Sequence, residues 1–395
     1  MIRLAYIVSH PIQYQAPLLR RIASEPGIDF TALFLSDFST RQYRDPGFGQ
    51  SIAWDVDLLS GYDSKVLRAW GDSDGVGLLQ PLTIGVEEEL RAGKYDAVWL
   101  HGYAHHAQLR ALVAAKKHGL KVLLRGESHA ASSHRSAVKT ALKQQILTRL
   151  FRKVDAFLAI GTANRDYYMS YGVAPEKIYM MPYAVDNARF QATATAERGR
   201  ALVRSLGLDP SRPVILYASK LQTRKRPWDL WHAYERLSPN GRDEPAPYLV
   251  YVGDGEERAA LEAAVASRGW TSVRFEGFQN QTTLPDYYAA CDVFVLPSER
   301  EPWGLVVNEV MNAGKPVIVS DQVGAAADLV EDGVNGFVVP VGDVETLADR
   351  LRWVTADRAV ARAMGEKSLQ RVSEWDYEAD VQGLLQAVDG CRGRG

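Results

Sequence analysis

The chain has 395 residues, of which 46% are hydrophobic, 24% charged and 10% aromatic, a composition typical of a two-domain globular protein that excludes disordered, collagen-like and coiled-coil chains. Its formal net charge of −2 at pH 7 argues against a dedicated nucleic-acid binder. The charge is divided unevenly, since residues 1–190 hold 23 Lys/Arg and 18 Asp/Glu whereas residues 191–395 hold 23 and 30, which suggests that the two halves meet different partners.

The front half alternates short β-rich runs with helical patterns. The β-rich runs cover residues 4–8, 30–35, 97–100, 121–124 and 157–160. Between the third and fourth runs, residues 106–118 place Leu109, Leu112 and Val113 at helical spacing. Strands that alternate with helices predict βαβ units, in which a parallel sheet is covered on both faces.

The rear half repeats this alternation, and a polar stretch near residues 186–212 separates the two halves. Its β-rich runs cover residues 214–218, 248–252, 293–296 and 316–319, and a final helix is expected around residues 377–388. We therefore predict an α/β fold with two Rossmann-like parallel-sheet domains facing across a cleft. The first domain is expected over residues 1–188, the second over 189–372, and a helix and tail over 373–395 that pack back on the first.

The strongest functional signal follows the run at 293–296. Glu301 lies in the tight loop Pro297-Ser-Glu-Arg-Glu-Pro-Trp-Gly304, and Glu309 lies about two turns into a helix expected to start near Trp303 and to end at Gly314. Free amides at a helix start bind anions, and carboxylates accept hydrogen bonds from sugar hydroxyls. Two acids beside an anion site fit a sugar joined to a nucleotide by phosphate. The structural alternative is an amphipathic surface helix with solvated acids.

A second signal follows the run at 214–218, where four cations lie within seven residues: Lys220, Arg224, Lys225 and Arg226. Such a cluster is tolerable at a strand end when a diphosphate lies among the cations, and it would stabilise charge on a leaving phosphate. A solvated basic loop is the alternative. The glycine turn at Gly253 leads from a strand to a helix without the G-x-G-x-x-G fingerprint of a dinucleotide site.

These motifs resemble the nucleotide-sugar-binding domain of family 4 glycosyltransferases, retaining enzymes of the GT-B fold. The likeness covers roughly residues 214–351 in the family's order. It lies in the E-x7-E pair Glu301 and Glu309, in the flanking Pro297-Ser298 and Ala313-Gly-Lys-Pro-Val-Ile, and in residues 253–255, 275–278 and 332–336. The front half is similar to the family more loosely, through Met181-Pro-Tyr-Ala-Val-Asp.

The resemblance implies a role for each matching position of the second domain. Glu309 would bind the ribose hydroxyls and Glu301 the hydroxyls of the donor sugar. Lys220 and Lys225, at the family's Arg and Lys positions, would stabilise the departing diphosphate and, with Glu301, are the catalytic candidates of this domain. The other donor-binding candidates are Ser219, Gly253, Phe278, Gln279, Asn280, Trp303, Gly304 and Leu305, of which residues 278–280 would meet the nucleobase.

The end of the first strand reads Ser9-His-Pro-Ile-Gln-Tyr-Gln15, where many relatives have a glycine-rich turn. This H-P-I-Q-Y sequence resembles a subset of family 4 enzymes implicated in surface-polysaccharide synthesis. His10, Gln13 and Tyr14 thereby become candidates for contact with the acceptor or the donor. Local helix capping and packing are the alternative.

Two further strand ends of the front half carry polar residues. His101 follows the run at 97–100 and is another cleft candidate, while the loop after 121–124 holds Glu127 and His129. Relatives often place a catalytically important His on that loop, and either residue could fill the position. His101, His105 and His106 could also suggest a metal. We expect none, because a carboxylate at ligand spacing is missing and the resemblance implies no metal.

A basic amphipathic helix is expected within residues 135–153, because no acidic residue lies between Ser128 and Val154. Such a helix can lie on an anionic leaflet, which suits a lipid-linked acceptor. A helix packed on the front sheet with a solvated basic face is the alternative. Residues 2–8 are too short for the core of a signal peptide, and no apolar run approaches the roughly 18 residues of a membrane span. We expect a cytoplasmic protein with peripheral contact at the inner face of the membrane.

The predicted activity is that of a retaining glycosyltransferase. It would move a hexose-type sugar from a nucleotide-diphosphate-sugar to a hydroxyl of a glycan or lipid-linked acceptor, in surface polysaccharide or glycoconjugate synthesis. We expect no metal, no other cofactor and no nucleic-acid partner. Two alternatives stay open: a catalytically silent subunit that binds a sugar nucleotide, and a GT-B nucleotide-sugar epimerase.

Overall fold

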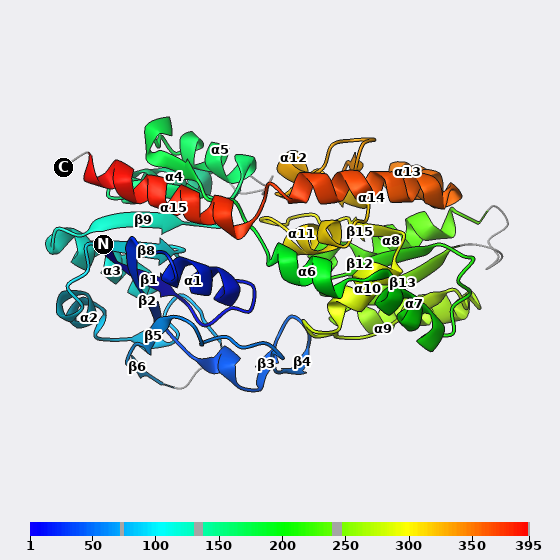
Figure 1. Cartoon of the computed structure of the whole chain (residues 1–395), viewed down its shortest axis with the longest axis horizontal. Coiled ribbons are helices and arrows are strands. Elements are labelled where there is room, and N and C mark those ends of the chain that lie inside the picture. The colour runs from blue at the N-terminus through cyan, green and yellow to red at the C-terminus, as the bar shows by residue number, and fades with distance from the viewer. Residues whose placement is uncertain (72–74, 130–136, 239–246, 394–395) are drawn as a thin grey trace. The chain divides into compact units, whose positions relative to one another are not determined.

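The computed structural model describes residues 1–71, 75–129, 137–238 and 247–393. The chain forms two compact units (Figure 1). The first comprises Met1–Tyr43, Ile52–Tyr183 and Tyr377–Gly395, and the second comprises Arg44–Ser51 and Ala184–Asp376. A short segment of the front half, residues 44–51, therefore belongs to the second unit.

The first unit is built on a parallel sheet that, in the described residues, has the strand order β11-β10-β9-β8-β1-β2-β5. Its strands are β1 (Ile2–Val8), β2 (Ile28–Phe34), β5 (Asp63–Val66), β8 (Ala97–His101), β9 (Lys121–Arg125), β10 (Ala156–Ala159) and β11 (Ile178–Met180). Two short strand pairs accompany the sheet, β3 (Tyr43–Asp45) with β4 (Gln50–Ile52) and β6 (Ala69–Trp70) with β7 (Leu82–Thr83).

Helices cover both faces of this sheet, as expected of parallel strands buried on two sides. One core contains buried residues of α2 (Val86–Ala92), α3 (His106–Lys117), α4 (Ala137–Phe151) and α5 (Thr162–Ser170). The other contains buried residues of α1 (Ala16–Ala23) and α15 (Tyr377–Arg392). Two single-turn 3₁₀ helices, Phe38–Thr40 and Pro175–Lys177, complete the unit.

Helix α15 packs closely on the first sheet. A Cβ atom at Gly383 would lie 2.0 Å from the carbonyl oxygen of Met180, so only glycine allows this approach. A Cβ atom at Gly390 would lie 1.8 Å from the hydroxyl oxygen of Tyr179. The helix continues to Arg392 rather than ending near residue 388 as predicted. The guanidinium of Arg125 forms a buried ion pair with Asp380 of α15, at 3.3 Å.

The second unit has a parallel sheet that, in the described residues, has the order β14-β13-β12-β15-β16-β17. The strands are β12 (Val214–Ala218), β13 (Tyr248–Val252), β14 (Val273–Phe275), β15 (Val293–Leu296), β16 (Val317–Ser320) and β17 (Gly336–Val339). The helices are α6 (Asn187–Thr193), α7 (Ala196–Ser205), α8 (Pro227–Glu235), α9 (Arg258–Ser267), α10 (Leu284–Ala290), α11 (Leu305–Asn312), α12 (Ala326–Leu329), α13 (Val344–Ala356), α14 (Arg358–Val372) and the 3₁₀ turn Thr223–Lys225.

Two parallel α/β sheets confirm the predicted fold class. One correction concerns α11, which begins at Leu305 rather than near Trp303. Gly304 caps the helix with a φ of +95°, so the two residues before it belong to the loop.

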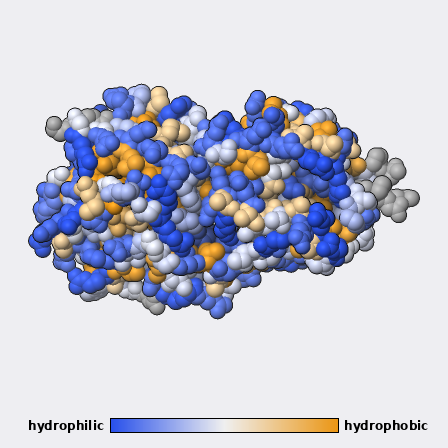
Figure 2. Space-filling view, viewed as in Figure 1, coloured by the Kyte–Doolittle hydropathy of each residue, from blue (hydrophilic) through white to orange (hydrophobic). Residues whose placement is uncertain are grey.

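One face of the molecule is mainly polar (Figure 2). Figure 2 shows one face, on which hydrophilic residues predominate and apolar patches are small and scattered. Among the helices of the described residues, none combines the length and the apolar character that crossing a bilayer requires.

Candidate active site

The donor-binding candidates of the second unit gather at one edge of its sheet. Because the strands are parallel, the carboxyl ends of β12, β13 and β15 point the same way, and Lys220, Gly253 and Glu301 follow these ends. A Cβ atom at Gly253 would lie 2.0 Å from the carbonyl oxygen of Ser219, so a glycine is required where these two turns meet. The edge therefore brings together residues that are distant in the sequence.

Lys225 and Glu301 form a buried ion pair at this edge. The Lys225 side chain is 10% exposed and that of Glu301 13%. Burial, with the nearby cations of Arg224 and Lys220, lowers the pKa of Lys225 to about 7. The carboxylate of Glu301 acts in the opposite direction, because an adjacent negative charge favours the ammonium form. A phosphate and a sugar hydroxyl could both find partners here, the first at Lys225 and the second at Glu301.

The other cations of this loop have partners within the chain. Arg226 pairs with Asp229 and lies 3.7 Å from Glu299, and Arg224 donates to the carbonyl oxygen of Arg300 at 3.4 Å. Carboxylates of the protein therefore offset part of the positive charge of this cluster, in addition to any bound diphosphate.

Lys220 meets a partner that sequence reasoning missed. Its Nζ lies 2.7 Å from Oδ1 of Asp45, in the segment 44–51 that belongs to this unit, and 4.6 Å from the ring centre of Phe48. Phe48 in turn packs edge-on against Phe278, with ring centres 4.8 Å apart. One candidate cation and one candidate nucleobase contact are thus both covered by the same short segment.

Glu309 lies on α11 and is 7% exposed, so it is not a solvated surface acid. The hydroxyl of Tyr288 donates to its Oε2 at 2.5 Å. Burial raises the pKa of Glu309 to about 7, although the Tyr288 hydrogen bond and the charge of Arg189 act against this. In its ionised form the carboxylate is a strong hydrogen-bond acceptor that the protein has only partly satisfied.

The remaining donor candidates are held by local contacts. Trp303 is buried, donates from Nε1 to Asn308 Oδ1 at 2.8 Å and stacks on Trp375 at 5.0 Å between ring centres. Gln279 donates to the carbonyl oxygen of Glu276, and the side chain of Asn280 accepts from the amide of Gln281. Gly304 and Leu305 form the start of α11, next to the Glu301 side chain.

The first unit has its own polar cluster at the carboxyl ends of β1, β8 and β9. His101 Nε2 lies 3.1 Å from Glu127 Oε1 and 2.9 Å from Gln15 Nε2. The hydroxyl groups of Tyr14 and Tyr183 both donate to Glu127, the first at 3.4 Å. Glu127 is thus the centre of this network. His129 lies two residues further on, beside residues that the structure does not describe.

Electrostatics keep Glu127 ionised. Burial alone would raise its pKa, but hydrogen bonds from His101 and Tyr183 and the charge of Arg125 outweigh this effect and lower it to about 2. A carboxylate that holds a histidine ring by one nitrogen is the arrangement of a general base and its orienting partner. This cluster could therefore position or deprotonate a hydroxyl group.

The first-strand motif contributes unequally to this cluster. Tyr14 and Gln15 belong to it directly, whereas His10 bonds Ser9 at 2.9 Å and packs on Phe38 at 4.5 Å between ring centres. Burial and the nearby His101 lower the pKa of His10 to about 4, so its ring is neutral at pH 7. Gln13 is half-buried at the turn that precedes α1.

The three histidines weighed as a metal site have separate contacts. His105 caps α3 by accepting from the amide of Ala107 at 3.0 Å. His106 approaches the carbonyl oxygens of Leu78 and Thr83, both at 3.3 Å. Among the described residues, no group of three or more His, Cys, Asp or Glu is arranged to hold a metal ion.

Residues 200–371 match the family model described as "Glycosyl transferases group 1", and residues 24–184 match the "Glycosyl transferase 4-like domain". These two stretches contain the principal residues of both polar clusters, except that Tyr14 and Gln15, at the end of the first strand, precede the first stretch. The assignment to the H-P-I-Q-Y subset stays a prediction.

Curated relatives align over part of their length. The chain is 32% identical over 217 residues to a D-inositol 3-phosphate glycosyltransferase of Jonesia denitrificans, covering 53% of this chain and 51% of that protein. It is 33% identical over 178 residues to the lipopolysaccharide core biosynthesis glycosyltransferase LpsE of Rhizobium meliloti, covering 45% and 49%. The chain thus spans about half the length of the curated relatives it matches.

Solved structures align over nearly the whole chain. Anabaena Alr3699/HepE, in complex with UDP, has a TM-score of 0.76 at 19% identity and covers 98% of this chain and 100% of that one. Sucrose-phosphate synthase from Thermosynechococcus elongatus has a TM-score of 0.75 at 20% identity and covers 100% of both. At these identities the likeness establishes the fold.

Proposed function

We propose that this chain transfers a sugar from a nucleotide-diphosphate-sugar to a hydroxyl of a glycan or lipid-linked acceptor, with retention of configuration. The chain matches a glycosyl transferase 4-like domain and a glycosyl transferases group 1 domain, and it has the GT-B fold. The observation that carries this proposal is the buried Lys225–Glu301 pair at the carboxyl edge of the second sheet. Such a pair offers a cation to a phosphate and an acceptor to a sugar hydroxyl within one small site.

In this proposal the donor binds along the edge of the second sheet. Glu309 accepts hydrogen bonds from the ribose, Glu301 accepts from the donor sugar, and the backbone at Gly304 and Leu305 faces the phosphates. As the bond between the sugar C1 and the phosphate oxygen breaks, charge develops on the diphosphate, and Lys225 stabilises it. The acceptor oxygen bonds to C1 on the same face, and its proton passes to the leaving phosphate.

The cluster around Glu127 and His101 is proposed to bind the acceptor hydroxyl. Its acceptor atoms and its histidine suit a hydroxyl that must be oriented before its proton passes to the leaving phosphate. Placement in the H-P-I-Q-Y subset and a role in surface polysaccharide or glycoconjugate synthesis belong to the same proposal. One structural relative was solved with UDP-glucose, which makes uridine diphosphate the first nucleotide to test.

A thermal-shift panel of UDP, GDP, ADP, dTDP and CMP, each with and without EDTA, tests the donor part of this proposal. Ligand at about 100 times its dissociation constant adds roughly 2.7 kcal/mol of stability, which gives a visible shift. We expect one nucleoside diphosphate to raise the melting temperature equally with and without EDTA. No shift with any of the five would contradict a nucleotide-sugar transferase, and a shift that EDTA abolishes would contradict metal independence.

We also propose that helix α4 of the first unit contacts the inner face of the membrane, where a lipid-linked acceptor would lie. On α4, Leu142 and Ile146 are 57% and 52% exposed, one turn apart, beside Lys139 and Lys143. Residues 135 and 136 of the predicted basic segment lie outside the described part of the chain. Exposed apolar side chains flanked by lysines suit an anionic leaflet.

Co-sedimentation with phosphatidylglycerol vesicles tests this contact. We expect the parent to bind and the double variant Leu142→Ser/Ile146→Ser to lose most of that binding. Val113→Ser, which removes an equally exposed apolar side chain from α3, serves as the control. Equal vesicle binding by the parent and the double variant would overturn the proposal while leaving the donor part intact.

A further inference from the structure

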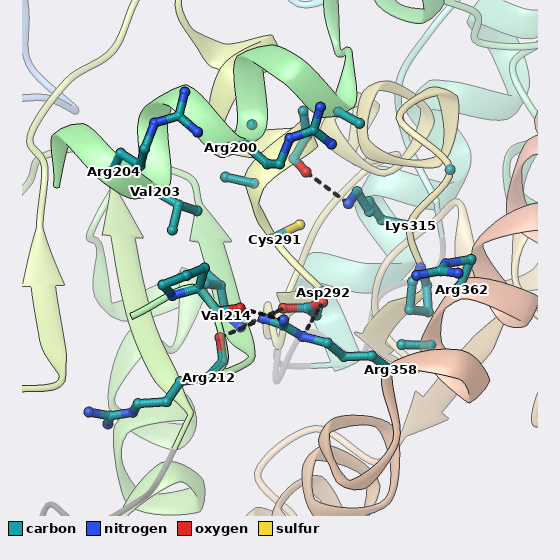
Figure 3. Close-up of a pocket in the computed structure, with 18 residues that line it drawn as sticks. Arg200, Val203, Arg204, Arg212, Val214, Cys291, Asp292, Lys315, Arg358 and Arg362 are labelled. Carbon is teal, nitrogen blue, oxygen red and sulfur yellow. Dashed lines mark hydrogen bonds and ion pairs between the residues drawn. The ribbon is translucent and has the colours of Figure 1, made fainter. Parts of the chain in front are cut away.

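The second unit contains a cavity whose lining residues are drawn in Figure 3. It lies at the edge of the sheet opposite to Lys225 and Glu301. Its volume is about 540 Å³. The lining residues Val214, Asp292 and Pro316 lie at or just before the starts of β12, β15 and β16, whereas the donor candidates follow the ends of strands. The cavity is therefore separate from the proposed donor site. The first turn of α14 and the middle of α7 form its walls.

Close packing of small residues sets these walls. A Cβ atom at Gly199 of α7 would lie 2.7 Å from the carbonyl carbon of Ala289, at the end of α10. A Cβ atom at Gly365 of α14 would lie 1.9 Å from the carbonyl oxygen of Gly314. Both helices are thus held at a fixed distance from the sheet, and the space between them is a consequence of the sequence rather than of loose packing.

The cavity is strongly basic although it lies in the acidic half of the chain. Residues 191–395 hold 23 Lys/Arg against 30 Asp/Glu. The cations that line the cavity are Arg200, Arg204, Arg212, Lys315, Arg358 and Arg362. Among the described lining residues, Asp292 is the single acid. Such a local excess of positive charge favours an anion.

Three of these cations have structural partners, namely Arg358, Lys315 and Arg212, whose guanidinium lies 4.1 Å from the ring centre of Tyr248. Arg358 reaches across to Asp292, with its Nε 3.2 Å from Oδ1, and donates to the carbonyl oxygens of Pro210 and Arg212, both at 2.6 Å (Figure 3). Lys315 donates to the carbonyl oxygen of Ala289 at 2.8 Å. Asp292 also accepts a hydrogen bond from the amide of Val214, so its carboxylate binds both this amide and the guanidinium of Arg358.

The other cations of the helical walls are Arg200, Arg204 and Arg362, and all three are exposed. Within the described part of the chain none of them forms an ion pair. Arg200 and Arg204 lie one turn apart on α7, a spacing at which like charges destabilise a helix. Long side chains at a rim can turn inward over a ligand. These three guanidinium groups are therefore available to an anion.

We propose that this cavity binds a small anion with at least two negative charges, of the phosphate-ester or diphosphate class. Two to three negative charges on the ligand would balance the charge of the three guanidinium groups. Each guanidinium can donate two hydrogen bonds to a phosphate. The volume lies within the range of roughly 300–1,000 Å³ that small-molecule sites occupy. Val203, Val214 and Cys291 give the cavity an apolar wall for the body of the ligand. The same anionic group could come from a soluble metabolite or from a lipid headgroup.

Isothermal titration with inorganic pyrophosphate tests the proposal directly. We expect Arg200→Gln and Arg362→Gln, one from each wall, each to weaken binding at least about tenfold, since a charge-assisted contact is lost. Both side chains are exposed, and unchanged melting temperatures would show that the variants fold. Lys367→Gln removes an exposed cation from α14 outside the cavity and should bind like the parent. Lys220→Ala reports any binding of the probe at the donor edge.

The outcomes separate cleanly. Weakening by both cavity variants, with parent-like binding by Lys367→Gln, supports the proposal. Parent-like binding by either cavity variant, loss of binding in Lys220→Ala alone, or the absence of binding in the parent overturns it. A parallel titration with vesicles that contain phosphatidic acid, whose phosphate monoester headgroup carries up to two negative charges, distinguishes the sources. If Arg200→Gln and Arg362→Gln also weaken vesicle binding, the ligand is a headgroup, and if vesicle binding is unchanged, it is a soluble anion.

Discussion

Asp45 holds Lys220 by two hydrogen bonds, with the ammonium nitrogen 2.7 Å and 3.0 Å from the two carboxylate oxygens. The two residues are 175 positions apart in the chain. In the proposed donor site Lys220 takes the position of the diphosphate-binding arginine of the family that the sequence resembles, so we expect the carboxylate of Asp45 to compete with a phosphate for the same cation. Phe48, three residues later, covers Phe278 in the same way. We therefore expect the segment 44–51 to affect donor binding.

Replacing Asp45 should strengthen nucleotide binding. In Asp45→Asn the ammonium of Lys220 loses its anionic partner and can bind the diphosphate. We therefore expect the dissociation constant of the best-bound nucleoside diphosphate to fall about three- to tenfold, which corresponds to the free energy of a partly exposed ion pair. Lys220→Ala should raise it. Calorimetry measures both, with Asp63→Asn of β5 as the control. Weaker binding by Asp45→Asn would instead make Asp45 a residue that positions Lys220.

The buried pair Arg125–Asp380 should be a main support of the first unit. The two side chains are 1% and 0% exposed. Asp380→Asn leaves a buried guanidinium without its counter-charge, so we expect a loss of about 3–5 kcal/mol in the free energy of unfolding. Asp389→Asn, on the same helix and 77% exposed, should change stability little. Denaturant unfolding compares the two, and equal stability would show that Arg125 is satisfied in another way.

Local patterns predicted most of the fold but few of the contacts in the sites. Strands such as β12 and β15 are apolar runs bounded by polar residues, so periodicity finds them. The edge strand β5, Asp63–Val66, has exposed or half-buried residues throughout and no apolar pattern to reveal it. The short strand β14 is also missed, because only one of its three residues, Val273, is buried.

The contacts around the candidate residues depend on the chain's path in space. Tyr183 meets Glu127 across 56 residues, and Tyr288 meets Glu309 from the neighbouring helix. No spacing rule connects such pairs, since the sheet order that brings them together is set by packing of the whole unit. Glu127 could be preferred over His129 only once the position of His101 was known.

Glu301 and Glu309 should affect different steps. Glu309→Ala removes the proposed ribose contact, so we expect the dissociation constant of the nucleoside diphosphate to rise about tenfold or more. Glu301→Gln should change that constant less than about threefold and lower kcat by about a hundredfold, because its contact is to the sugar and strengthens in the transition state. Binding of nucleotide and turnover of its sugar conjugate are measured side by side. Unchanged nucleotide binding in Glu309→Ala would rule out the ribose contact.

The Glu127 network should govern use of the acceptor. Glu127→Gln keeps the shape of the side chain but removes the charge that orients His101, so we expect transfer to the acceptor to fall about a hundredfold. Hydrolysis of the donor in the absence of acceptor, and nucleotide affinity, should stay near the parent values. His129→Ala is the matched comparison on the same loop. A larger effect from His129→Ala than from Glu127→Gln would move the catalytic role to the histidine.

Glu309 should make the stability of the second unit depend on pH near neutrality. Its pKa is raised to about 7 from an ordinary value of 4.5, so between these values the folded state binds more protons than the unfolded state. Stability is therefore fully present below about pH 4.5 and falls as the pH rises through 7, by about 3 kcal/mol in all. Glu309→Gln can still accept the Tyr288 hydrogen bond and cannot ionise, so its stability should lack this fall. Unfolding of the ligand-free parent and variant between pH 4.5 and 8 measures the difference. A difference that stays constant over this range would mean that Glu309 ionises in the folded protein as readily as in the unfolded chain.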